Sequence, residues 1–150
     1  MIRAYEVDDL KSTANVWLRS GRVEYSYLPE FQKLDQAKAV EVFRMVIQDQ
    51  CNIWVFEKSD VVVGFLAMEG NLIDRLYVDP EHQKKGIGSD LIAYAKEINP
   101  DGLVLRTHEQ NSKARNFYEQ RGFKPVRYGL SPPPESMPDI EYRWSSDSTA

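Results

Sequence analysis

The sequence predicts a mixed α/β domain in which a meander of strands is followed by a crossover helix. Between residues 52 and 78, apolar runs are separated by the turn pairs Ser59-Asp60 and Gly70-Asn71, which is typical of antiparallel strands. From Gly86 the apolar period changes from two to 3.6 residues, which indicates a helix. Because such crossovers are right-handed, we expect the strands before and after this helix to be parallel.

The other elements follow from apolar spacing, from helix caps and from the Gly and Pro residues that interrupt helices. Towards the N-terminus we expect a strand at 2–7, a helix from Asp8 or Asp9 to a stop at Gly21, a loop or short irregular helix at 22–34, and a helix capped by Asp35. Further on we expect strands at 52–57, 61–68 and 72–78, a helix at 86–98, a strand at 103–105, a helix from Asn111 to Gly122, and strands at 123–128 and 140–144.

The chain length of 150 residues fits one domain, which we place at residues 1–144. We expect Pro132-Pro133-Pro134 to form a surface loop and residues 145–150 to form a flexible tail.

Composition excludes several classes of protein. The net charge of −4 disfavours general binding to nucleic acid or to a membrane surface. The sequence contains no apolar stretch long enough to span a membrane, and its charged N-terminus does not resemble a signal peptide, so we predict a cytoplasmic protein. The single cysteine, Cys51, fits a reducing compartment, and no Cys/His cluster has the spacing of a metal site.

The most informative segment joins the last strand of the meander to the crossover helix. The first N–H groups of a helix have no partner within the helix, and the helix dipole favours negative charge there. Gly86 and Gly88 leave room for a phosphate beside these N–H groups, while Lys84 and Lys85 add positive charge. The segment therefore predicts a polyphosphate site. It is neither a P-loop nor a dinucleotide fingerprint, because the residues after Gly88 are Ser89, Asp90 and Leu91.

Two motifs make a family resemblance specific. Val78-Asp79-Pro80 followed by Gln83-Lys84-Lys85-Gly86-Ile87-Gly88 resembles the coenzyme A pyrophosphate loop of the GNAT N-acetyltransferase superfamily. The segment from Asn111 to Phe123 resembles that family's Asn-x-x-Ala-x-x-Phe-Tyr-x-x-x-Gly-Phe helix and turn. The resemblance extends from about Val61 to Val126. It implies a central sheet of six to seven strands, mostly antiparallel with one splayed parallel pair, flanked by about four helices.

The resemblance also implies acetyl-CoA as cofactor and transfer of its acetyl group to a primary amine. Tyr118 would protonate the leaving thiolate, a role that a phenol can chemically fill; the alternative is that Tyr118 packs beside Phe117. Asn111 would bond the cofactor arm and cap its helix. The remaining implied cofactor-binding residues are Leu76, Tyr77, Val78, Gln83, Lys84, Lys85, Gly86, Ile87, Gly88 and Ser89.

The general base and the acceptor site are less defined. Asp74 shares strand parity with Leu72, Leu76 and Val78, so a regular strand would bury it and raise its pKa, as suits a base. A β-bulge would reverse that parity, and a salt bridge to a nearby Arg is the alternative role. Further candidates for the base are Glu69, His108 and Glu109. In the family, the stretch containing Arg22, Glu24, Tyr25 and Tyr27 forms the acceptor pocket, although an exposed loop without that role is equally compatible with these residues.

We therefore predict an N-acetyltransferase that works by direct attack in a ternary complex, since no Ser or Cys lies beside a base as an obvious nucleophile. Its acceptor would be a small-molecule amine or a protein amine. The alternative is a non-catalytic acyl-CoA-binding or sensor module. A homodimer is possible, and the resemblance points to the strand at 140–144 as its interface.

Overall fold

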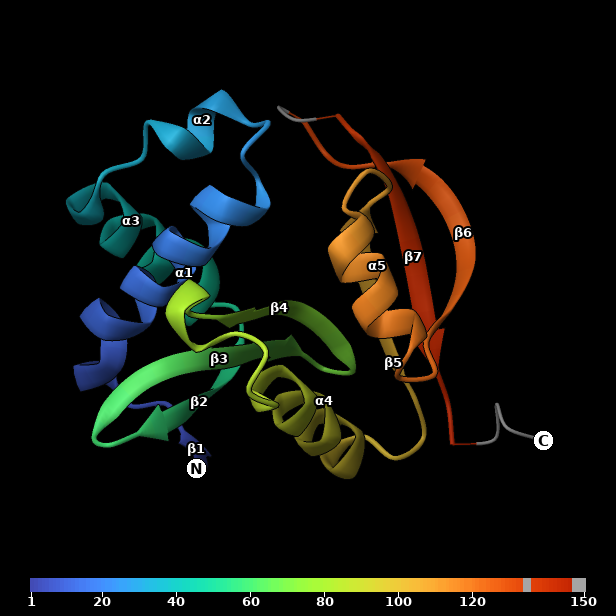
Figure 1. The fold of residues 1–150 in the computed structure, drawn as a ribbon, viewed down its shortest axis with the longest axis horizontal. Coiled ribbons are helices and arrows are strands. Elements are labelled where there is room, and N and C mark those ends of the chain that lie inside the picture. Colours follow the sequence, from blue (N-terminus) through green and yellow to red (C-terminus); the bar gives the residue numbers. More distant parts are fainter. Residues whose placement is uncertain (134–135, 147–150) are drawn as a thin grey trace. The chain divides into compact units, whose positions relative to one another are not determined.

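A computed structural model of the chain describes residues 1–133 and 136–146 (Figure 1). These residues form two compact units. Unit 1 contains residues 1–69 and 74–94, and unit 2 contains residues 70–73 and the described part of 95–150. The single domain over 1–144 stays a prediction. Pro134 of the expected loop and residues 147–150 of the expected tail lie outside the described residues.

The chain has the predicted mixed α/β class, with a seven-stranded sheet in the order β1-β2-β3-β4-β5-β7-β6. The N-terminal elements are β1 (Ile2–Ala4), η1 (Val7–Asp9), α1 (Leu10–Glu24), α2 (Pro29–Gln32), α3 (Gln36–Val42) and η2 (Phe43–Gln48). The meander and crossover are β2 (Asn52–Lys58), β3 (Val61–Glu69), β4 (Leu72–Val78), η3 (Pro80–His82) and α4 (Ile87–Ile98). The C-terminal elements are β5 (Leu103–His108), α5 (Ser112–Glu119), β6 (Lys124–Leu130) and β7 (Pro138–Trp144).

Strand β3 carries the core of unit 1 on both of its faces. On one face, the buried ring of Phe65 packs edge to face on Phe43, which in turn contacts Trp17 of α1. On the other face, a Cβ added to Gly64 would lie 3.3 Å from Cγ2 of Ile87 in α4. Helices α1 and α4 therefore pack on opposite faces of this strand, which places the C-terminal end of β4 and the α4 start within one packed unit (Figure 1).

Helix α1 continues past the predicted stop at Gly21 and ends at Glu24. Gly21 is needed for packing, because a Cβ there would lie 2.1 Å from Cζ of Phe31. The side chain of Phe31 packs against Trp17 with ring centroids 5.4 Å apart, so its ring occupies the place that a larger residue would fill. The prediction of a stop was wrong because a tertiary contact, and not the helix end, selects glycine here.

The other helix predictions of unit 1 are confirmed with changed lengths. Asp35 caps α3 as expected, and its side chain accepts a hydrogen bond from the Lys38 N–H at 2.8 Å. The expected single helix after Asp35 is α3 followed by a π-helical segment, Phe43–Gln48. Within the expected loop at 22–34, residues 22–24 belong to α1 and Pro29–Gln32 form the short helix α2.

Unit 2 contains the predicted parallel pair. Leu72 pairs with Val104 and Ile73 with Leu105, so β4 and β5 are parallel. The predicted splay between these strands stays a prediction. Strand β7 pairs with β5 on one side and with β6 on the other, and both partners are antiparallel to it.

The position of β7 limits how this strand can contact a second copy. Ile140 and Tyr142 are fully buried within unit 2, and β7 has a partner strand along both edges. A strand paired on both edges cannot add a further strand from a second copy. Strand β6 is the edge strand on this side of the sheet. Homodimerisation itself stays a prediction.

Candidate active site

The predicted phosphate loop connects β4 to α4 within unit 1. Asp79 accepts a hydrogen bond from the Glu81 N–H at 3.0 Å and so caps the short η3 helix. The backbone then turns through positive φ values at Lys84 (65°) and Gly86 (85°), and α4 begins at Ile87. Lys84, Lys85 and Gly86 are exposed, and a Cβ on Gly86 would meet nothing within 4 Å.

The start of α4 has the geometry of an anion site. The N–H of Asp90 bonds the carbonyl of Gly86 at 3.0 Å, which is the i to i−4 bond of the first helical turn. The N–H groups of Ile87, Gly88 and Ser89 precede this bond and lie at the positive end of the helix dipole. The structure thus brings together the helix start, the two glycines and the two lysines that the sequence singled out.

Helix α1 holds the junction between β4 and this loop. The Val78 carbonyl accepts hydrogen bonds from the buried Ser20 hydroxyl at 2.9 Å and from the Gln83 side-chain amide at 3.0 Å. The buried Asp79 carboxylate lies 3.4 Å from the Arg19 guanidinium. The backbone N–H of Asp79 donates to the Val63 carbonyl at 2.8 Å. Sequence reasoning missed Ser20 and Arg19, because no local pattern links residues separated by about sixty positions.

These bonds change the roles expected for two of the predicted cofactor-binding residues, Val78 and Gln83. A carbonyl oxygen has two lone pairs, and both lone pairs of Val78 are engaged by Ser20 and Gln83. The Val78 carbonyl is therefore already satisfied within the protein. The Gln83 side chain donates to the protein backbone and so positions the loop from inside.

Two predicted sets of residues meet at Tyr25 and Tyr77. The Tyr77 hydroxyl donates a hydrogen bond to the Tyr25 hydroxyl at 3.1 Å. Tyr25 also contacts Tyr27 edge to face, with ring centroids 6.1 Å apart. Burial raises the pKa of Tyr25 and of Tyr77, so both phenols are neutral near pH 7. Glu24 is the half-buried last residue of α1, directly before this aromatic group.

Arg22, which the sequence grouped with these residues, has a structural contact. Its guanidinium donates to the Leu34 carbonyl, and the Gln32 side chain donates to the Arg22 carbonyl at 3.0 Å. Arg22 therefore ties the end of α1 to the chain that follows α2.

The expectation that Asp74 is buried was wrong. Its side chain is 30% exposed, and the buried positions of β4 in the core of unit 1 include Tyr77, which has the opposite parity. The Arg75 Nε lies 3.7 Å from the Asp74 carboxylate, which is the ion pair named as the alternative. The Cys51 thiol also donates to this carboxylate, with the sulfur 3.7 Å from Oδ2. The role of Asp74 as base stays a prediction, and Glu69 is exposed.

The two remaining predicted residues belong to unit 2. Asn111 is buried and caps α5 as expected, since its side chain accepts a hydrogen bond from the Ala114 N–H at 3.2 Å. Tyr118 is half-buried, and its ring packs at 5.1 Å from Phe117 and 5.6 Å from Phe123. This aromatic packing is the alternative role named for Tyr118, and a half-buried phenol can fill both roles.

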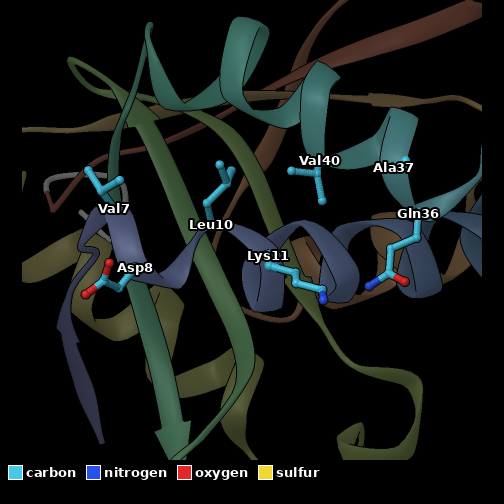
Figure 2. A pocket seen from close by; sticks show the side chains of 7 residues that line it. All are labelled: Val7, Asp8, Leu10, Lys11, Gln36, Ala37 and Val40. Atoms are coloured by element: carbon cyan, nitrogen blue, oxygen red, sulfur yellow. The ribbon is translucent and has the colours of Figure 1, made fainter.

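Unit 1 also contains a pocket of about 630 Å³ that is separate from the predicted site residues (Figure 2). None of the predicted site residues lines it, and we assign it no role. Its lining residues come from η1, the first turn of α1 and α3, and they are Val7, Asp8, Leu10, Lys11, Gln36, Ala37 and Val40.

The described residues contain neither a metal-ligand cluster nor a membrane-spanning helix. Among residues 1–133 and 136–146, no three or more His, Cys, Asp or Glu side chains are grouped so that they could hold a metal ion. Over the same part of the chain, no helix combines the length and the apolar character needed to cross a bilayer.

Comparison with known proteins identifies the family. The acetyltransferase (GNAT) domain matches residues 49–125. The peptidyl-lysine N-acetyltransferase YjaB of Salmonella typhimurium is 31% identical over 110 residues, covering 73% of this chain and 72% of that protein. The peptidyl-lysine N-acetyltransferase YiaC of Escherichia coli is 27% identical over 124 residues, covering 82% of each chain.

Solved structures agree with this fold. The solution structure of apo YjaB from Escherichia coli has a TM-score of 0.76 at 24% identity and covers 96% of each chain. The PaiA N-acetyltransferase of Thermoplasma acidophilum in complex with coenzyme A has a TM-score of 0.74 at 23% identity, covering 97% of this chain and 98% of that one. The chain therefore belongs to the GNAT acetyltransferase family, which confirms the expected fold, the N-acetyltransferase activity and acetyl-CoA as its cofactor.

Proposed function

We propose that the pyrophosphate of acetyl-CoA binds the segment from Gln83 to Ser89, at the start of α4. The observation that carries this proposal is the loop itself, where positive φ values at Lys84 and Gly86 lead directly into a twelve-residue helix. A helix start carries about half an elementary positive charge. Exposed Lys84 and Lys85 add two full charges beside it. An anion with several phosphate oxygens fits this donor set.

The pantetheine arm follows β4 in this proposal. The parallel pairing of β4 with β5 comprises Leu72 and Ile73. The later residues of β4, which are Leu76, Tyr77 and Val78, follow this pairing. An extended arm can pair with backbone groups of such a strand in the manner of an added strand. With its carbonyl engaged by Ser20 and Gln83, Val78 contributes its N–H, which would bond the thioester carbonyl. Asn111 is proposed to bond the same arm while it caps α5.

The reaction is proposed to be a direct attack of the amine on the thioester. A lysine-like amine has a pKa near 10.4 and must lose a proton first, and Asp74 is the proposed base. The thiolate that leaves takes a proton from Tyr118, the proposed acid. Cys51 does not offer a covalent route, because burial raises the pKa of its thiol to about 12 and leaves it protonated.

The acceptor is proposed to be a primary amine of a protein or a small molecule. Two relatives are named peptidyl-lysine N-acetyltransferases, and a third, from Thermoplasma acidophilum at 26% identity, is named a spermidine N(1)-acetyltransferase. Glu24, Tyr25 and Tyr27 are proposed to contact this acceptor. The contact between Tyr25 and Tyr77 supports this, since it joins the aromatic group to the proposed cofactor strand.

Replacing Tyr118 with Phe tests the chemistry. We expect kcat to fall by roughly 100-fold or more, as is typical for loss of a general acid, while the Kd for coenzyme A stays unchanged. Tyr128→Phe is the matched control, because Tyr128 is exposed on β6 and lies outside the proposed site. Unchanged turnover in Tyr118→Phe would remove Tyr118 as the acid.

Steady-state kinetics with an amine panel tests the mechanism. Intersecting lines at varied acetyl-CoA and amine support a ternary complex, whereas parallel lines would contradict direct transfer. If coenzyme A binds but no amine is acetylated, the non-catalytic binding or sensor module replaces the enzyme as the better interpretation.

A further inference from the structure

Arg75 of β4 has an unusual environment. Its Nε is buried and has no hydrogen-bond partner, and no residue in the described part of the chain accepts a hydrogen bond from the guanidinium. The nearest contacts are the Asp74 carboxylate, 3.7 Å from Nε, and the Trp17 ring, whose centroid lies 5.8 Å from Cζ. The charge is therefore partly balanced, while the buried Nε–H has no acceptor.

Such an arrangement is costly unless a ligand completes it. A guanidinium has five N–H donors in a planar fork and stays charged at all physiological pH values. A buried donor without an acceptor destabilises the folded protein, and the penalty is larger for a charged group. The Arg75 side chain keeps 30% of its surface exposed, so an anion in solution can reach it.

The position of Arg75 links it to the acceptor. It precedes the proposed pantetheine strand, and its neighbour on the same strand face, Tyr77, bonds Tyr25 of the proposed acceptor group. At about 3.3 Å per residue, the Cα of Arg75 lies roughly 10 Å along β4 from that of Val78. An acceptor of this length could therefore place one end on the Arg75 side chain and its amine nitrogen at the thioester.

We propose that Arg75 binds a carboxylate on the acceptor, so that the enzyme acetylates amines which also carry a negative charge. The planar fork of arginine matches the two oxygens of a carboxylate and forms two parallel hydrogen bonds. This inference rests on the proposed function and narrows its acceptor class. The carboxylate belongs either to a free amino acid or to an acidic residue beside a lysine in a peptide.

Matched acceptor pairs separate these two sources. L-lysine is compared with cadaverine, which is the same amine without the carboxylate, and acetyl-Lys-Glu-amide is compared with acetyl-Lys-Gln-amide. Binding of each compound is measured by calorimetry in the presence of coenzyme A, so the result does not depend on turnover. For at least one pair, we expect the carboxylate-bearing member to bind about tenfold more tightly or better.

Variants then assign this preference to Arg75. Arg75→Gln should reduce the preference to within about twofold, while Arg75→Lys, which keeps the charge without the fork, should retain part of it. Arg44→Gln is the control, since Arg44 is an exposed arginine of η2. Arg75→Gln also removes the ion pair to Asp74 and the contact with the Trp17 ring, so coenzyme A binding in the same titrations serves to show that the variant is folded.

The proposal is overturned if no carboxylate-bearing compound binds better than its partner, or if Arg75→Gln weakens both members of a pair equally. Failure of the proposed function has a different signature, because coenzyme A would then either not bind in the same titrations or bind without acetylation of any amine in the panel.

Discussion

Replacing Gly86 with Ala is the sharpest test of the phosphate loop. Gly86 has a φ of 85°, and an added Cβ would meet no protein atom within 4 Å. The only cost to the stability of the protein without cofactor is therefore the left-handed backbone conformation, which destabilises an L-residue by roughly 1–2 kcal/mol. For a chain of this size, that corresponds to a fall in melting temperature of roughly 2–8 °C.

The effect on the cofactor should be separate and larger. The Cβ would occupy the open side of the loop, where the proposed phosphate approaches the N–H groups of α4. A charge-assisted hydrogen bond contributes roughly 1.5–3 kcal/mol, and each 1.4 kcal/mol is tenfold in affinity. Displacing one such bond should thus raise the Kd for coenzyme A roughly 10- to 100-fold. Titration calorimetry of the purified variant with coenzyme A measures this change.

Gly70 supplies the matched control. It has a φ of 61° in the turn between β3 and β4, and a Cβ there also meets nothing within 4 Å. Gly70→Ala should therefore lower the melting temperature by a similar amount and leave coenzyme A binding intact. The reasoning is refuted if Gly86→Ala binds coenzyme A as the wild type does, or if both variants lose affinity equally.

Three further predictions concern stability and reactivity. Ser20→Ala removes a buried bond to the Val78 carbonyl and should lower the free energy of unfolding by about 1 kcal/mol in urea denaturation, with an unaltered m-value; no loss would mean that the bond contributes nothing. The hydrogen bonds from Arg3 hold the pKa of Asp9 below its ordinary 3.8. The contribution of Asp9 to the free energy of unfolding is therefore complete above pH 3.8 and is lost as the pH falls through the lower pKa of the folded state. The stability difference between wild type and Asp9→Asn should accordingly shrink in acid, and a difference constant with pH would contradict this. The Cys51 thiol, with a pKa of about 12, should react with a thiol reagent at pH 8 at least about 100-fold more slowly in the native protein than after unfolding. Equal rates would show that it is not protected.

Local rules predicted the loop well and failed where packing decided the outcome. The positions of the glycines and of the α4 start could be predicted because a turn and a helix start depend on adjacent residues. Gly21 shows the opposite case. A glycine near a helix end usually marks its stop, but here α1 continues because the Phe31 ring lies on Gly21.

Strand β4 shows a second limit. Alternation along a strand divides its side chains into two faces, but it does not say which face meets which helix. Sequence parity placed Asp74 inside with Leu76, whereas Asp74 is 30% exposed, and the buried residues Tyr77 and Val78 lie on opposite faces of the strand. The identity of the buried face depends on where the helices lie, and that depends on residues far along the chain.

From sequence alone, the Gln83–Gly88 loop, the capped helix after Asn111 and the family could be determined, because each depends on neighbouring residues and their spacing. Only the tertiary structure assigned the Val78 carbonyl to Ser20, joined Tyr25 to Tyr77 and left the buried Arg75 Nε–H without an acceptor. The physical reason is that hydrogen bonds and burial between distant segments form only once the helices pack on the sheet, and residue spacing carries no record of that packing.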